Sequence, residues 1–165
     1  MSWMKPIAAL VAIAAASISL SACLGGSDEP ETPAEPQEIA GDADPQDVEV
    51  IEGWSDALRG GDVDAAAEYF AVPSVAVNGL GLRIGSRDDA RAFNQSLPCG
   101  ARLIKAEGEG ELTTATFRLT ERPGPGECGD GVGRTAKTAF RIRDGEIVEW
   151  RRVGKADPAA PGQIT

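Results

Sequence analysis

Residues 140–153 read FRIRDGEIVEWRRV, and this stretch decides the fold. Two runs rich in strand-forming residues flank Asp144-Gly145, a dipeptide typical of two-residue hairpin turns. The pattern therefore predicts antiparallel strands over 134–143 and 146–153. Upstream, residues 112–121 (LTTATFRLTE) alternate apolar and polar side chains, which predicts a strand with one buried face. With residues 101–107 before it, the C-terminal half predicts four antiparallel strands.

The residues before these strands predict three helices. Apolar side chains recur every three or four positions on the first of them: Val48, Ile51, Trp54 and Leu58. Asp62 is placed to cap a second helix over 63–70, and Ser86 with Asp89 has the spacing of a capping box before a third over 87–97. Between the second and third helices, SVAVNGLGLRIG predicts a short hairpin around Asn78-Gly79.

This segment order resembles the nuclear transport factor 2-like (SnoaL-like) superfamily. The resemblance is carried by IEGWSDALRGGDVDAAAEYFA (51–71) and FRIRDGEIVEWRRV, and it covers about residues 48–153. It implies an α+β cone in which a curved antiparallel sheet packs on three helices. The superfamily includes isomerases, dehydratases, epoxide hydrolases and polyketide cyclases, but also ligand binders and association modules. Function therefore has to be argued from the site.

The first 22 residues predict a lipoprotein signal peptide. Lys5 precedes a 13-residue apolar run (7–19), which is shorter than the roughly 20 residues that span a bilayer. Residues 20–23 (LSAC) then resemble the lipobox of bacterial lipoproteins. The resemblance implies that Cys23 receives a diacylglyceryl group and becomes the first mature residue. The alternative is an ordinary secretory signal cut after Ala22, with Cys23 a free thiol.

Composition divides the rest of the chain into three parts. Residues 23–47 hold a proline-rich stretch with eight acids and no base, which predicts a disordered tether beginning at the lipidated Cys23. Residues 48–155 form the predicted cone domain, and 156–165 a disordered tail. The tether carries most of the net charge of −10, so the domain is nearly balanced and nucleic acid is not an expected partner. The predicted location is the extracytoplasmic face of the cell membrane.

Two cysteines remain after lipidation of Cys23. Export places Cys99 and Cys128 in an oxidising compartment, and the expected strand pairing brings them to the same end of the sheet. We therefore predict a disulfide between them. A redox-active or metal-binding pair is the alternative, but the chain has no CxxC motif and no histidine.

Candidate catalytic residues are few. Without histidine, and with no Asp on the predicted strands, the best candidate base is Glu149, with Arg151 or Tyr69 as a partner. The alternative is a solvated or ion-paired glutamate. Six aromatic residues could line a pocket between helices and sheet, or simply form the core: Trp54, Tyr69, Phe70, Phe93, Phe117 and Phe140. Four basic residues could contact anionic envelope polymers, or form a solvated face: Arg118, Lys137, Arg141 and Arg143.

These patterns favour a membrane-anchored lipoprotein whose domain binds a small apolar ligand or an envelope protein without catalysis. One alternative is a small hydrolase- or isomerase-like enzyme of the same superfamily. Another is an accessory subunit of an envelope complex. The sequence predicts no metal site and no cofactor, and it leaves the oligomeric state open.

Overall fold

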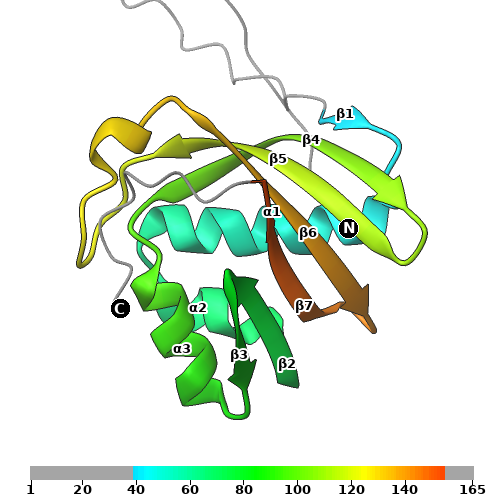
Figure 1. Cartoon of the computed structure of the whole chain (residues 1–165), viewed down its shortest axis with the longest axis horizontal. Coiled ribbons are helices and arrows are strands. Elements are labelled where there is room, and N and C mark those ends of the chain that lie inside the picture. The colour runs from blue at the N-terminus through cyan, green and yellow to red at the C-terminus, as the bar shows by residue number, and fades with distance from the viewer. Residues whose placement is uncertain (1–38, 155–165) are drawn as a thin grey trace, which may run out of the picture. The chain divides into compact units, whose positions relative to one another are not determined.

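A computed structural model describes residues 39–154 of the chain (Figure 1). Cys23, the predicted signal peptide and the predicted tail over 156–165 lie outside the described residues. Within them, the elements follow in this order: β1 (Ala40–Gly41), α1 (Pro45–Gly60), α2 (Val63–Glu68), β2 (Phe70–Asn78), β3 (Leu80–Ile84), α3 (Arg87–Ser96), β4 (Gly100–Glu109), β5 (Leu112–Thr120), a 3₁₀ turn (Gly129–Gly131), β6 (Thr135–Arg143) and β7 (Glu146–Val153).

The strands form one curved sheet in the order β1-β4-β5-β6-β7-β2-β3. The predicted hairpin of β6 and β7 is confirmed: Asp144 (φ 53°) and Gly145 (φ 77°) both have the positive φ that a tight type I′ turn requires. The hairpin of β2 and β3 is also present, turning at Gly79. The fold is therefore α+β, as predicted.

The four C-terminal strands, β4 to β7, pair antiparallel as predicted, but the sheet as a whole is mixed and not antiparallel throughout. β2 pairs with β7 in parallel, and β1 pairs with β4 in parallel. Parallel partners need a long connection, and here the chain between β2 and β7 passes through α3 and four other strands. The described fold also begins at β1, before the expected domain boundary at Val48, and α1 begins at Pro45 within the predicted tether.

The three helices cover one face of the sheet, here called the inner face. α1 runs beneath the curved strands β4 to β6, while α2 and α3 lie at the end that holds β2 and β3 (Figure 1). The predicted caps are confirmed, because the Asp62 side chain accepts from the backbone N–H of Ala65 and Ser86 from that of Asp89. No helix among residues 39–154 has the length and apolar character needed to cross a membrane.

Candidate functional site

The space between the helices and the sheet is occupied by six aromatic side chains, here called the aromatic cluster: Trp54, Phe70, Phe93, Phe117, Phe140 and Trp150. The Trp54 ring meets the rings of Phe70, Phe117 and Phe140 edge to face, with centroids 6.4, 6.0 and 5.5 Å apart. Phe93 lies 5.6 Å from Phe70 and 5.2 Å from Trp150. These edge-to-face contacts and the near-complete burial of the rings are typical of a packed core.

Five of the six aromatic residues that could line a pocket therefore belong to this cluster. Trp54, Phe70, Phe93, Phe117 and Phe140 are each at most 6% exposed. The sixth, Tyr69, follows α2 and is half-buried, with its ring against α1. A Cβ on Gly53 would collide with the Tyr69 hydroxyl, so the side chain lies directly on the backbone of α1.

Polar groups in the interior are few, and none of them is acidic. Among residues 39–154, the buried polar or charged side chains are Ser55, Ser74, Asn94, Thr113, Arg122 and Thr138. Asn94 accepts a hydrogen bond from Trp54 Nε1 (2.8 Å) and donates to the carbonyl of Ala90 (2.9 Å), so it is satisfied within the core. General acid–base catalysis needs a group that exchanges protons near neutral pH. The buried side chains of residues 39–154 do not include such a group.

Two buried polar atoms on the inner face have no hydrogen-bond partner within the described protein. They are the Oγ of Ser74 on β2 and the Nε1 of Trp150 on β7, in residues that are 3% and 5% exposed. Ala76 is the register partner of Trp150, which places Ser74 two residues along the neighbouring strand and on the same face. A buried hydrogen-bond donor without a partner destabilises the fold. A small polar group that formed a hydrogen bond with these atoms would therefore gain most of its binding free energy here.

Glu149, the candidate base, lies on the opposite, outer face of the sheet. Its carboxylate forms ion pairs with Arg141 (3.4 Å) and Arg151, and its side chain is 17% exposed. Arg151 was one of two partners considered for Glu149, and Tyr69 was the other. The structure places Glu149 and Tyr69 on opposite sides of the sheet, so they do not form a joint site. Both carboxylate oxygens of Glu149 are therefore engaged by arginines on the outer face.

A shallow depression lies at the edge of the sheet, away from these residues. It is lined by β1, the start of α1 and Ala106 of β4, and its volume is about 320 Å³. The lining side chains are apolar or absent, so it offers binding surface but no reactive group: Ile39, Ala40, Gly41, Ala43, Pro45, Val48 and Ala106.

The predicted disulfide between Cys99 and Cys128 is confirmed. Gly131 packs directly on it, since a Cβ there would lie 3.0 Å from the Cys128 sulfur. Beside it, Arg122 donates hydrogen bonds to the carbonyls of Leu97 (2.8 Å), Gln95 (3.0 Å) and Asn94 (3.3 Å) at the end of α3. Burial lowers the pKa of Arg122. The covalent link and this arginine together fix the glycine-rich loop to α3.

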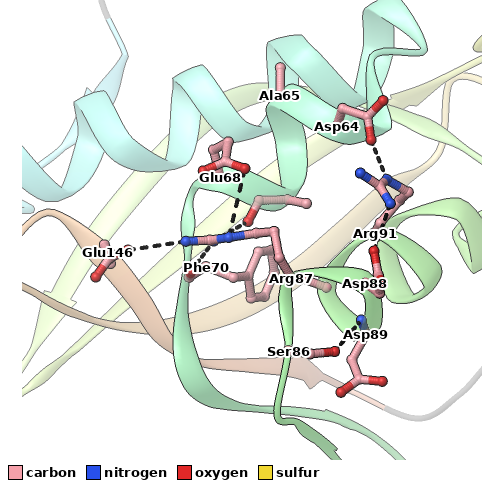
Figure 2. Close-up of polar contacts among 12 residues, drawn as sticks. Asp64, Ala65, Glu68, Phe70, Ser86, Arg87, Asp88, Asp89, Arg91 and Glu146 are labelled. Carbon is pink, nitrogen blue, oxygen red and sulfur yellow. Dashed lines mark hydrogen bonds and ion pairs between the residues drawn. The ribbon is translucent and has the colours of Figure 1, made fainter.

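Arg87, at the start of α3, joins four elements (Figure 2). Its Nη1 donates to the carbonyls of Ala67 (2.8 Å) and Phe70 (2.5 Å), at the junction of α2 and β2. Its other nitrogens approach Glu68 (3.7 Å) and Glu146 (3.9 Å), the latter at the start of β7. The residue therefore holds together the two strands whose parallel pairing the sequence did not predict.

We expect Arg87→Ala to lower the free energy of unfolding by about 2 kcal/mol, because two carbonyls lose a charged donor. Urea unfolding followed by circular dichroism measures this. Arg91→Ala is the matched control on the same helix: Arg91 is exposed and pairs with Asp64 and Asp88, which raise its pKa. Because exposed ion pairs contribute little, the control should unfold like the parent. Equal losses in the two variants would contradict a special role for Arg87.

No three or more Cys, Asp or Glu side chains among the described residues are placed to hold a metal ion.

This chain has the nuclear transport factor 2-like fold. An NTF2-like protein of unknown function from Cytophaga hutchinsonii matches 64% of this chain and 87% of its own, with a TM-score of 0.50 and 11% identity. A protein from Sinorhizobium meliloti, provisionally named a polyketide cyclase, matches 64% and 94% of the two chains, with a TM-score of 0.48 and 20% identity.

A protein from Kribbella flavida, provisionally named a ketosteroid isomerase, covers 73% of this chain and 88% of its own, with a TM-score of 0.47 and 16% identity. No protein-family model matches the sequence. No curated protein matches it either. At such identities the similarity establishes the fold and not the activity.

Proposed function

We propose that this protein is a lipoprotein, anchored through Cys23 to the outside of the cell membrane, whose folded domain binds a partner without catalysis. The observation that supports a non-catalytic role is the interior of the domain. Aromatic rings occupy the space in which an acid–base site of this fold would lie, and no carboxylate is buried within residues 39–154. Recognition then falls to the surface, which makes a protein or another macromolecular surface the favoured partner.

The anchor is supported by the sequence LSAC at 20–23 and by the confirmed disulfide. Disulfides persist in oxidising compartments outside the cytoplasm, so the pair is consistent with export. Two acyl chains give stable membrane attachment, whereas one chain gives only weak, reversible binding.

We expect Cys23→Ala to move the protein from the membrane fraction to the soluble one, because the substitution removes the sulfur that carries the lipid. Fractionation of cells followed by immunoblotting measures this. Ser21→Ala is the control, since it keeps the cysteine and a small residue before it and should stay in the membrane fraction. Retention of the Cys23→Ala protein in the membrane would contradict lipid anchoring.

A second candidate function is the binding of a small ligand on the inner face. It is favoured by one observation, the two unpartnered polar atoms of Ser74 and Trp150. A ligand there would have to supply a hydrogen-bond acceptor for the indole N–H. A surface-binding domain requires no such ligand, so the two candidates differ in what the purified protein retains.

A further inference from the structure

The outer face of the sheet carries a compact group of cations, here called the cationic cluster: Arg102, Lys105, Arg118 and Lys137. Register places them side by side. Arg102 lies directly opposite Arg118 across β4 and β5, and Thr116 has Lys105 on one side and Lys137 on the other. The residues flanking Arg102 and Arg118 on their own strands are buried or half-buried, so both guanidinium groups project away from the core.

Three members of the cluster have no carboxylate within ion-pair distance among the described residues. Only Lys105 is paired, with Glu107 at 2.7 Å. On the other half of the same face the arginines are neutralised: Arg141 pairs with Glu111 and Glu149, and Arg151 with Glu149. Like charges directly opposite each other destabilise a sheet. An arrangement that brings Arg102 against Arg118 without a counter-charge is therefore suited to an external anion.

Charge is divided between the two sides of the domain. The helices that cover the inner face carry eight acids and three bases. A domain with a basic sheet face and an acidic helical face orients with its basic side toward an anionic surface. The cationic cluster supplies guanidinium and ammonium donors, and Thr116, with its hydroxyl, lies between Lys105 and Lys137. Such groups bind phosphate oxygens.

The chain reaches the domain at this edge of the sheet. β1 is hydrogen-bonded to β4 at Lys105 and Ala106, and Ile39 directly precedes it. If Cys23 is the anchor, sixteen residues separate the bilayer from Ile39, which limits their separation to about 55 Å. A tether of that length keeps the membrane at high effective concentration, so even weak contacts with lipid headgroups would be occupied.

We propose that the cationic cluster binds the phosphate groups of anionic phospholipids, so that the domain lies with the outer face of its sheet against the membrane. The choice of a membrane as the anionic partner rests on the proposed lipid anchor. The ability of the cluster to bind phosphate does not, and it can be measured on protein that carries no lipid.

The test uses residues 24–165 and vesicles of two parts phosphatidylcholine to one part phosphatidylglycerol, with pure phosphatidylcholine for comparison. We expect co-sedimentation with the anionic vesicles only, and its loss when salt is raised from about 50 mM to about 500 mM, because salt screens such contacts. Neutralising the three unpaired cations should weaken binding on the order of a hundredfold, since each contributes roughly a fivefold gain near an anionic surface. That variant is Arg102→Gln, Arg118→Gln, Lys137→Gln.

The control removes the same charge from the other half of the sheet. It is Arg141→Gln, Arg143→Gln, Arg151→Gln. We expect a loss of less than about tenfold there, because these arginines are already paired with carboxylates and lie farther from the cluster. Thermal unfolding of both variants establishes that they are folded. The single variant Arg118→Gln, expected to lose about fivefold, gives a second reading with the smallest perturbation.

Equal losses in the two triple variants would overturn the proposal, because net charge and not the cluster would then control binding. Binding to neither kind of vesicle would also overturn it, even if Cys23→Ala releases the protein from cells. Tight binding of linear polyphosphate without binding to anionic vesicles would contradict the membrane assignment and indicate a soluble polyanion instead. None of these outcomes depends on whether the protein is anchored by a lipid in cells. The proposed lipid anchor and the proposed phosphate-binding cluster can therefore fail separately.

Discussion

Replacing Phe140 by alanine is expected to lower the free energy of unfolding by about 4 kcal/mol. The Phe140 ring is fully buried and lies 5.5 Å from the Trp54 ring and 6.1 Å from the Phe117 ring, measured between centroids. Truncation removes the apolar contact area and leaves a cavity that the surrounding rings cannot fill completely. Urea unfolding measures the loss, and the slope of the unfolding free energy against urea concentration should be the same in the variant and the parent.

This prediction distinguishes a packed core from a ligand pocket. If Phe140 lined an open pocket, truncation would cost less than about 1 kcal/mol, since one side of the ring would have no protein contacts to lose. Leu80→Ala is the matched control for removal of a large apolar side chain, because Leu80 is 87% exposed. It should change stability by at most about 0.5 kcal/mol. A small loss for Phe140→Ala would contradict the account of the interior.

Removing the disulfide should cost about 3–4 kcal/mol. Cys99 and Cys128 are 29 residues apart, and the chain-entropy model gives a loss of this size when a loop of that length is released in the unfolded state. The variant Cys99→Ala with Cys128→Ala, compared with the oxidised parent in urea, measures it. The native contacts of Arg122 with the end of α3 should keep the variant folded.

The parent protein under reducing conditions is the control for the two alanine substitutions. It breaks the same bond while both side chains stay in place, so its stability should fall by a similar amount. If the reduced protein is as stable as the oxidised one, the link contributes nothing and the loop is held by Arg122 alone.

The sequence predicted the elements whose signals are local. Asp144-Gly145 specifies a tight turn whatever the rest of the chain does, and β7 (Glu146–Val153) has the predicted bounds. Asp62 and Ser86 cap their helices through backbone N–H groups three residues away. The cysteine pair was predicted because export and the strand order both indicated it.

The features that were missed depend on partners far away in the chain. The parallel pairing of β2 with β7 joins Val75 to Glu149, and no residue of either strand specifies that neighbour. β1 has only two residues and therefore no periodicity to detect. The sequence carries no signal for the roles of Arg87 and Arg122, because their acceptors are backbone carbonyls that only the folded chain brings within reach.

The sequence named candidate residues for the site but did not predict how they lie relative to one another. The sequence left open whether the aromatic residues line a pocket between helices and sheet or form the core, because alternation alone cannot tell a ring that lines a pocket from a ring that contacts other rings. For Glu149 the sequence left Arg151 and Tyr69 open as partners, and the structure shows an ion pair with Arg151. Its second partner, Arg141, becomes visible only through the register of β6 and β7.

The measurement that tests the central claim most directly is native mass spectrometry of the tether-free domain purified from its own cell envelope. A domain whose interior is filled by its own aromatic rings should show the mass of the polypeptide with one disulfide and no retained small molecule. A stoichiometric small ligand, lost in a variant that replaces Trp150 by phenylalanine, would contradict the claim and establish the inner face near Ser74 as a binding site.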